Sequence, residues 1–340
     1  MAKKKVAIAK NTPPPPKYKE SQEPFLTIII PLYNKEHYIK DALNSILMQE
    51  TIYKYQILIS DNASTDDSLK IAKEYQSKYP DLITILESEQ NIGITKNMSK
   101  LYSFINTPYF ARIDPDDYWI SNTKIQDALD FLESHKDYTS YQDKTIMEYP
   151  DRKQIFVDYP IDHTCDFQSF LKGMGATMGH ASNSFFRTSL LKNHINNINH
   201  INNIKNPKNE AFKELFSGES IMNFIALYEG KAYHGTKVGS VYRIDGKGVC
   251  SSHSQIDQKF YIVFLWRNMW EYFDEKYMIF LLVSCQLYVS NKDKIIEYLY
   301  SIEDDKKLRT KINELKELES LYNANMQKLV ELQNGLQTNR

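Results

Sequence analysis

The most informative sequence in the chain is Ala111-Arg112-Ile113-Asp114-Pro115-Asp116-Asp117-Tyr118-Trp119, which places three carboxylates directly after an apolar run. Burying like charges side by side is costly unless a cation neutralises them. Oxygen ligands at Asp-x-Asp spacing suit a hard divalent ion such as Mg2+ or Mn2+. If the chain stays extended, Asp114 and Asp116 point to the same face and can converge on one ion. The alternative is a solvated acidic turn, because Asp-Pro-Asp-Asp is also good turn chemistry.

The composition limits the class of protein. The chain has 340 residues, a net charge of -1 and three widely spaced cysteines. This length allows one large domain, or one domain with an appendage. The charge balance gives no reason to expect nucleic-acid binding. The cysteines form neither a disulfide framework nor a zinc pattern, which fits a reducing compartment.

The ends of the chain bear on its location. Residues 1–23 are basic and then proline-rich, which predicts a disordered leader with a polyproline II patch. Their apolar piece is too short for the core of a signal peptide. The longest apolar run, residues 277–289, is too short to cross a bilayer. We expect a cytoplasmic protein, with peripheral contact to the inner face of the membrane left open.

Between residues 25 and 113, short apolar runs alternate with segments of helical periodicity. Near-continuous apolar runs are typical of strands covered on both faces. The alternation predicts an α/β fold with a mostly parallel, Rossmann-like sheet flanked by helices. The predicted strands are 25–31, 55–61, 82–86 and 109–113, and predicted helices cover about 34–49, a segment from 68 onward, and about 95–105.

Polar or conformationally special residues follow each of these four predicted strands. In open sheets of this class, ligands bind at the carboxyl ends of the strands, so these residues are expected to line one nucleotide-type pocket. No Gly-x-Gly-x-x-Gly and no Gly-Lys-Ser/Thr follows the first strand, which argues against a dinucleotide oxidoreductase and a P-loop enzyme. The residues at the strand ends are Pro31, Tyr33, Asp61, Asn91, Gly93, Asp114 and Asp116.

Four ordered motifs resemble those of the family 2 glycosyltransferases of the GT-A fold. The resemblance is strong over about residues 25–119 and continues weakly to about residue 252. Asn62 departs from the family, which often has a second aspartate there, although an amide could still hydrogen-bond the base or ribose. The motifs are Ile28-Ile29-Ile30-Pro31-Leu32-Tyr33-Asn34-Lys35-Glu36, Asp61-Asn62-Ala63-Ser64-Thr65-Asp66, Asn91-Ile92-Gly93-Ile94-Thr95-Lys96-Asn97 and Asp114-Pro115-Asp116-Asp117-Tyr118-Trp119.

The resemblance implies a nucleotide-sugar site at these motifs. Pro31 and Tyr33 would flank the nucleobase, with Tyr33 stacking on it. Asp61 would accept a hydrogen bond from the uracil N3–H group. Further residues would lie near the base, ribose or diphosphate, and a lysine among them could neutralise phosphate charge. These further residues are Glu36, Asn91, Gly93 and Lys96.

The same resemblance implies a divalent metal, Mn2+ or Mg2+, at the acidic motif. Asp116 would bind the ion that bridges the diphosphate, and Asp117 would support it. Asp114 would contact the ribose or the donor sugar and share in the metal site.

Two later segments are candidates for contacts with acceptor or donor. The glycine-rich stretch 173–187 lies under the donor sugar and acceptor in relatives, which makes His180 and Ser182 candidates; a structural role is the alternative. A glycine-containing loop over the donor would carry Arg243 and Lys247, either of which could reach phosphate. A salt-bridged, structural Arg243 is the alternative there.

Glu219 stands just before an apolar helical segment. A carboxylate in a first helical turn is favoured by the helix dipole alone. Inverting members of the family, however, place an aspartate or glutamate at a comparable helix start as the general base, and the resemblance assigns this role to Glu219. Relatives often carry Glu-Asp or Gly-Asp where this chain has Glu219-Ser220.

The C-terminal part reads as helices. Apolar residues at spacings of three and four over 308–336 predict a coiled coil or a helical hairpin, and with it a homo-oligomer. The predicted organisation is a leader (1–23), a GT-A domain (24–253, with a nucleotide-sugar half 24–119 and an acceptor half 120–253) and a helical extension (254–340).

The predicted function is inverting transfer of a sugar from a nucleotide-sugar, favouring a UDP-sugar, to a hydroxyl group. Glu219 would deprotonate that hydroxyl, and a metal at Asp116 would stabilise the departing diphosphate. The acceptor would be a growing bacterial surface glycan, free or lipid-linked, of the capsule, lipooligosaccharide or O-antigen type. Two alternatives remain: a sugar-nucleotide nucleotidyltransferase, and a non-catalytic or partner-dependent assembly protein that keeps a nucleotide-sugar pocket.

Overall fold

The computed structural model describes residues 23–155, 163–167, 180–192, 218–244, 263–267, 269–270 and 277–338. The chain divides into two compact units. Unit 1 comprises Met1–Phe167, Thr177–Ile195 and Met222–Ile244, and unit 2 comprises Gln168–Ala176, Asn196–Ile221 and Asp245–Arg340. The predicted leader up to residue 22, residues 173–179 of the glycine-rich stretch, and Lys247 lie outside the described residues.

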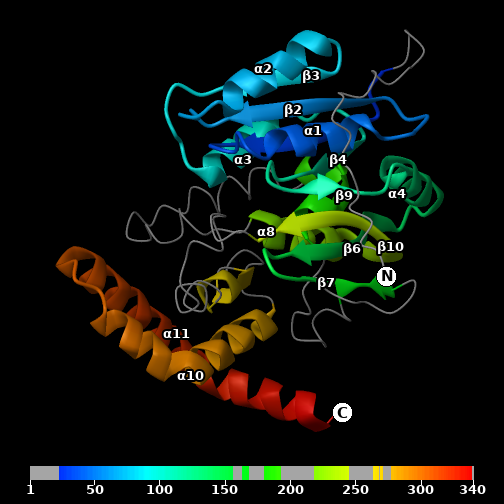
Figure 1. The fold of residues 1–340 in the computed structure, drawn as a ribbon. Helices are drawn as coiled ribbons and strands as arrows, with labels where there is room; N and C mark the ends of the chain where they lie inside the picture. Colours follow the sequence, from blue (N-terminus) through cyan, green and yellow to red (C-terminus); the bar gives the residue numbers. More distant parts are fainter. Residues whose placement is uncertain are drawn as a thin grey trace. The chain divides into compact units, whose positions relative to one another are not determined.

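Unit 1 is built on a ten-stranded sheet in which four parallel strands come first along the chain (Figure 1). Strand β1 (Leu26–Leu32) lies between β2 (Tyr55–Asp61) and β4 (Tyr109–Arg112), and β3 (Ile83–Glu87) pairs with the far side of β2. Every residue of β1 is buried, as its apolar sequence predicted. The mixed α/β fold with a mostly parallel central sheet is therefore confirmed.

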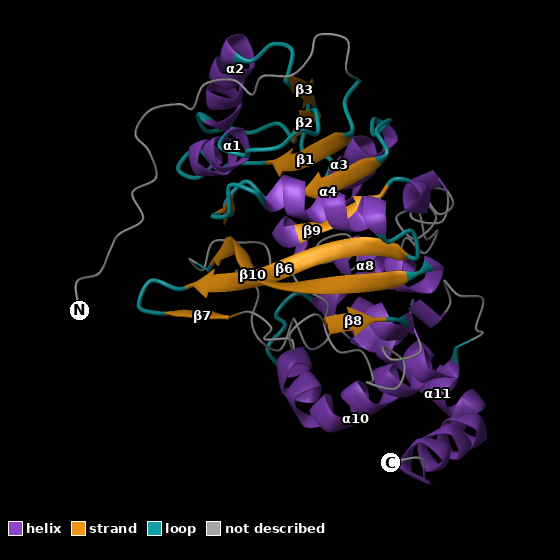
Figure 2. Cartoon of the chain, turned by 90° about the vertical axis from the view of Figure 1, so that its right-hand side faces the viewer, coloured by secondary structure: helices purple, strands orange, loops and turns teal. Residues whose placement is uncertain are grey.

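Helices connect these strands and cover both faces. Figures 1 and 2 show α1 and α2 on one face of the parallel strands and α3 on the other. The prediction that a helix starts near residue 34 is wrong, because Asn34 adopts a positive φ of 49° that an α-helix does not accept. The helices are α1 (Ile39–Leu47), α2 (Ser68–Lys78) and α3 (Ile94–Ser103).

Beyond β4 the sheet continues with a strand that runs antiparallel to its neighbours, followed by two long strands. Strand β9 (Ser184–Arg187) runs antiparallel between β4 and β6 (Tyr138–Glu148). Strand β10 (Lys231–Arg243) runs beside β6 in parallel, and Figure 2 shows these two as the longest strands. Short pieces complete the unit: β5 (Tyr118–Trp119), α4 (Lys124–Ser134), β7 (Lys153–Ile155), β8 (His163–Cys165) and the 3-10 turn η1 (Ala181–Asn183). Helix α8 (Gly218–Glu229) precedes β10.

Unit 2 contains a helical hairpin. Helices α10 (Met278–Tyr300) and α11 (Asp305–Thr338) follow one another and contact each other. Tyr322 of α11 hydrogen-bonds Ser284 of α10 at 2.7 Å between the two hydroxyl oxygens. The predicted segment 308–336 lies within the single helix α11, which forms a hairpin with α10. Among the described residues, no helix is long and apolar enough to cross a membrane.

Candidate active site

The loop after β1 is tied to the loop after β2 by hydrogen bonds. The Asn34 backbone N–H donates to Ser64 Oγ (3.1 Å), and the Thr65 backbone N–H donates to Asn34 Oδ1 (2.8 Å). The Lys35 backbone N–H donates to Ser68 Oγ at 2.6 Å. Because these are neighbouring parallel strands, their carboxyl ends meet at one edge of the sheet, and the ties fix both loops there.

Glu36 belongs to the same set of ties. Its Oε2 atom accepts the Asp67 backbone N–H at 2.8 Å, and its own backbone N–H donates to Asp66 Oδ2 at 3.1 Å. The structure therefore gives this residue, which was predicted to bind the nucleotide-sugar, a contact that holds the two loops together.

On the side expected for the base, Asp61 is 1% exposed at the end of β2. Its Oδ2 atom accepts the Ser64 backbone N–H at 3.1 Å, whereas Oδ1 is buried without a hydrogen-bond partner in the described part of the chain. A buried carboxylate oxygen normally finds a donor. Tyr33 is 41% exposed and Pro31 is buried. The structure thus offers one unsatisfied acceptor and one exposed ring at neighbouring strand ends.

The turn after β3 carries the next predicted residues. Asn62 donates through Nδ2 to Asn91 Oδ1 at 2.9 Å and accepts the Ile92 backbone N–H at 2.9 Å. Asn91 Oδ1 also accepts the Gly93 backbone N–H at 2.9 Å. Gly93 has φ of 80°, a conformation that favours glycine. Asn62 therefore fixes this turn, and Lys96 lies exposed on α3 just beyond it.

The acidic motif forms a turn, so the extended conformation considered for it is wrong. The Asp117 backbone N–H donates to the Asp114 carbonyl oxygen at 3.0 Å. Asp114 is paired with Arg112, whose Nη2 atom lies 2.7 Å from Oδ1. Asp116 is paired with Lys35 at 2.6 Å between Nζ and Oδ2. Burial raises the pKa of Asp116 and of Asp117; Lys35 opposes the rise at Asp116, and the neighbouring carboxylates add to it at Asp117.

Asp117 is the buried member of the motif, at 1% exposed. Ser182 donates through Oγ to its Oδ2 atom (2.5 Å), and the Arg243 backbone N–H donates to its Oδ1 atom (3.1 Å). Ser182 Oγ also accepts the Asp114 backbone N–H at 2.9 Å. One hydroxyl therefore holds two members of the acidic turn, which places the predicted Ser182 beneath this turn.

His180 lies against the same turn. Its ring stacks on Tyr242, with 4.1 Å between ring centroids, and burial lowers its pKa from 6.5 to about 4. Its Nδ1 atom accepts the Ser182 backbone N–H at 3.3 Å and lies 3.5 Å from Asp117 Oδ2. Because the ring is neutral near pH 7, the approach of Nδ1 to Asp117 is not an ion pair at that pH.

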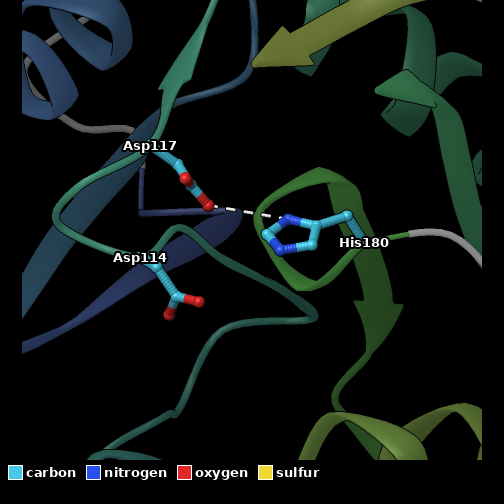
Figure 3. A group of neighbouring side chains, drawn as sticks. All are labelled: Asp114, Asp117 and His180. Atoms are coloured by element: carbon cyan, nitrogen blue, oxygen red, sulfur yellow. Dashed lines mark ion pairs between the residues drawn. The ribbon is translucent and has the colours of Figure 1, made fainter. Parts of the chain in front are cut away.

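Three side chains here could hold a metal ion. One atom each from Asp114, Asp117 and His180 lie within 4.8 Å of one another, and Figure 3 shows the Asp117 carboxylate and the His180 ring facing each other with Asp114 beside them. Two carboxylates and a neutral imidazole suit a divalent ion. This donor set fits the predicted metal, although Asp116, predicted as its main ligand, contacts Lys35 instead.

Arg243 contacts a carboxylate, a carbonyl oxygen and an aromatic ring. Its Nη2 atom lies 2.5 Å from Asp41 Oδ2, its Nη1 atom donates to the Asp116 carbonyl oxygen at 3.2 Å, and its guanidinium lies 4.4 Å from the centre of the Tyr118 ring. These are the contacts of the structural alternative weighed for it. They also join β10 to α1 and to the acidic turn.

Sequence reasoning missed Lys35 as a site residue. Its contact with Asp116 follows from strand order, because β1 and β4 are adjacent parallel strands whose ends lie together. The sequence shows a lysine after β1 and an acidic cluster after β4. These two features indicate an ion pair only once it is known that β1 and β4 are neighbours in the sheet. Glu219 lies in the first turn of α8, as predicted for that segment, and its side chain is outside the description.

Comparisons with known proteins identify the family of the first half of the chain. The family described as Glycosyl transferase family 2 matches residues 27–195. The dTDP-rhamnosyl transferase RfbG of Shigella flexneri is 34% identical over 147 residues, which cover 42% of this chain and 50% of RfbG. The putative glycosyltransferase EpsE of Bacillus subtilis is 32% identical over 116 residues, which cover 34% of this chain and 41% of EpsE. The chain thus spans half or less of the length of the curated relatives it matches.

Two solved structures share the fold. S. aureus TarS 1-349 in complex with UDP-GlcNAc has a TM-score of 0.58 at 16% identity and covers 86% of this chain and 80% of its own. The mannosyltransferase PcManGT of Pyrobaculum calidifontis, in complex with GDP-Man and Mn2+, has a TM-score of 0.52 at 14% identity, covering 89% and 88%. Residues 27–195 of this chain, which include the acidic turn, therefore belong to glycosyl transferase family 2.

Proposed function

We propose that this chain transfers a sugar from a UDP-sugar to an acceptor hydroxyl with inversion at the anomeric carbon. The observation that carries the proposal is that Asp61, with its unsatisfied buried oxygen, and the acidic turn Asp114–Asp117 both lie at the carboxyl ends of parallel strands in a family 2 domain. Similar folds in TarS and PcManGT hold UDP-GlcNAc and GDP-Man, which supports a nucleotide-sugar as the donor.

The nucleotide end of the donor is assigned to the loops after β1 and β2. Asp61 Oδ1 accepts the N3–H group of uracil, which gives the buried oxygen its missing donor. Tyr33, exposed beside it, stacks on the base. Lys96 faces solvent on the neighbouring helix and supplies positive charge near the phosphates.

The acidic turn is assigned to the diphosphate. Asp114, Asp117 and His180, together with Asp116, would hold a divalent ion, and Mn2+ or Mg2+ suits these donors. When bound, such an ion stabilises negative charge on the leaving diphosphate. Ser182 and the Arg243 backbone orient the Asp117 carboxylate for this task. Arg243 itself acts by holding the turn to α1 rather than by contacting phosphate.

The general base is assigned to Glu219 at the start of α8. Its carboxylate takes the proton of the acceptor hydroxyl as the hydroxyl oxygen attacks the anomeric carbon and the bond to the diphosphate breaks.

The proposed acceptor is a bacterial surface glycan, free or lipid-linked. The Minor teichoic acid biosynthesis protein GgaB of Bacillus subtilis, 32% identical over 111 residues that cover 12% of its length, supports an acceptor of this kind by its name. The proposed catalytic domain is 24–253, with 254–340 as a helical extension.

The test is UDP release from a panel of UDP-sugars with Mn2+ or Mg2+ and a set of glycan acceptors. We expect metal-dependent turnover of one donor, and losses of about a hundredfold or more in Asp116→Asn and Glu219→Gln, since single catalytic groups contribute on this scale. Glu219→Gln should still bind UDP. Unchanged transfer by Glu219→Gln contradicts the base assignment, and the absence of UDP binding by the native chain contradicts the donor class.

A further inference from the structure

Lys35 and Asp116 form an ion pair inside the proposed diphosphate site. Lys35 Nζ lies 2.6 Å from Asp116 Oδ2, and the two side chains are only 16% and 19% exposed. Two neighbouring carboxylates, Asp114 and Asp117, contribute to the negative potential at this turn. Arg112 pairs with Asp114, Arg243 donates to the Asp116 carbonyl oxygen, and Lys35 forms the ion pair with the Asp116 carboxylate. The pair therefore neutralises a carboxylate that burial would otherwise disfavour in its charged form.

The backbone that carries Lys35 is held firmly. Its N–H donates to Ser68 Oγ at 2.6 Å, and the next residue, Glu36, is tied to Asp66 and Asp67. The lysine side chain, in contrast, is a flexible four-carbon stem that ends in a rotatable ammonium group. The fixed backbone thus keeps the ammonium within reach of the acidic turn, while the stem allows it to exchange one anionic partner for another.

We propose that Lys35 is an exchangeable counter-ion. It neutralises Asp116 when no divalent ion is bound, and it moves to the donor diphosphate when the nucleotide and the ion arrive together. This inference rests on the proposed function. Two cations against one carboxylate repel each other at short range, so an ion alone must displace Lys35. A diphosphate brings the anionic oxygens that a released ammonium binds well.

A binding order follows from this exchange. A divalent ion that arrives alone competes with Lys35 and binds weakly. The same ion arriving with a nucleoside diphosphate binds more tightly, because Lys35 gains a phosphate as it loses Asp116. Metal and nucleotide are therefore coupled through one side chain, and by linkage each raises the affinity of the chain for the other.

The experiment compares native protein, Lys35→Met and the matched control Lys40→Met, which replaces an exposed lysine on α1. Mn2+ binding is measured without nucleotide by electron paramagnetic resonance, and UDP binding by calorimetry with and without Mn2+. For Lys35→Met we expect about tenfold tighter binding of Mn2+ alone and at least fivefold weaker binding of UDP in the presence of Mn2+, which is the size of a typical coupling. Lys40→Met should match native protein in both.

Two further variants make the result specific. Adding Asp116→Asn to Lys35→Met should abolish the gain in Mn2+ affinity. If the gain persists, Lys35 does not compete with the ion for Asp116, and the proposal is overturned. Lys35→Arg should bind Mn2+ alone as weakly as native protein, because it keeps the competing charge. Circular dichroism confirms folding, and Lys35→Gln replaces Lys35→Met if the latter does not fold.

The binding experiments distinguish a wrong inference about Lys35 from a wrong proposed function. If native protein binds Mn2+ and UDP and Lys35→Met binds Mn2+ no more tightly, Lys35 is a fixed structural partner and the exchange is wrong. If no variant binds UDP, the donor assignment itself is wrong.

Discussion

At the residue scale, the buried carboxylate of Asp117 is stabilised by hydrogen bonds from one hydroxyl and one backbone N–H group. Its carboxylate is 1% exposed, yet both oxygens accept hydrogen bonds, one from Ser182 and one from the Arg243 backbone. Donors aimed at the ionised form oppose the rise in pKa that burial causes. Ser182 also holds the Asp114 backbone N–H, so it sets the shape of the turn as well as the charge within it.

His180, in the same cluster, makes folding stability depend on pH. Burial lowers its pKa from 6.5 to about 4, so between these values the unfolded chain binds a proton that the folded chain does not. The stability that the neutral ring contributes is complete above pH 6.5 and is lost as pH falls toward 4, by up to about 3 kcal/mol. In His180→Gln this loss is absent, so the free energy of unfolding of native protein relative to the variant should fall across the window.

Urea denaturation from pH 4 to 7 measures this difference, and NMR titration of the imidazole measures the protonation directly. The variant His37→Gln, which replaces an exposed histidine, controls for removal of an imidazole. A difference that stays constant with pH, or an imidazole that titrates near pH 6.5, contradicts the prediction.

At the scale of elements, a buried ion pair and the hydrogen bonds beside it join three segments, α4, β6 and η1. Lys124 of α4 lies 3.1 Å from Asp143 of β6, and both side chains are at most 1% exposed. Lys124 also donates to Asn183 of η1, which in turn donates to Thr145 Oγ1 at 2.9 Å. A side chain at Gly239 of β10 would meet Lys124 Nζ at 2.7 Å, so the pair also requires glycine there. The turn η1, which carries Ser182, is thus held to α4 and β6.

Replacing Lys124 with methionine should destabilise the fold. The change leaves Asp143 charged and buried without its cation, and breaking such a pair typically costs about 3–5 kcal/mol. Denaturation midpoints in urea measure the loss. The control Lys136→Met removes a pair with Glu133 that is exposed on the surface and should change stability by less than about 0.5 kcal/mol. A loss below about 1 kcal/mol in Lys124→Met would mean that Asp143 finds another partner.

The elements differ in how far the sequence predicts them. The strands β1, β2 and β4 are predictable as apolar runs, because a strand buried on both faces has no solvent side. The strand β3 is less buried, but its apolar residues still predict it. The 13-residue strand β10 escaped prediction, since its sequence mixes Lys231, His234, Gly235 and Lys237 with apolar residues. The start of α1 depends on Asn34 and its partners on another loop. Motif spacing located the acidic turn, but the pairing of Asp116 with Lys35 depends on strand order, which no local pattern contains.

At the scale of the whole molecule, all described residues assigned to the donor lie in unit 1, whereas the helical hairpin lies in unit 2. Each unit has its own buried contacts. In unit 2, Tyr322 is 4% exposed and its hydroxyl contacts Ser284 Oγ, which itself donates to the Val263 carbonyl oxygen at 2.6 Å. The tyrosine hydroxyl is therefore the donor in its bond to Ser284, and burial raises its pKa.

Tyr322→Phe should separate stability from donor binding. It removes one buried hydrogen bond, at a cost of about 1 kcal/mol, and should lower the melting temperature by a few degrees. The affinity for UDP with Mn2+ should stay within about twofold, because the hydrogen bond lost lies within unit 2, and changes that share no partners act independently. Thermal unfolding and calorimetric titration measure the two effects, with Tyr300→Phe, at an 88% exposed tyrosine of α10, as the control that changes neither. A fall in UDP affinity that accompanies the fall in melting temperature would show that the hairpin helps to shape the donor site.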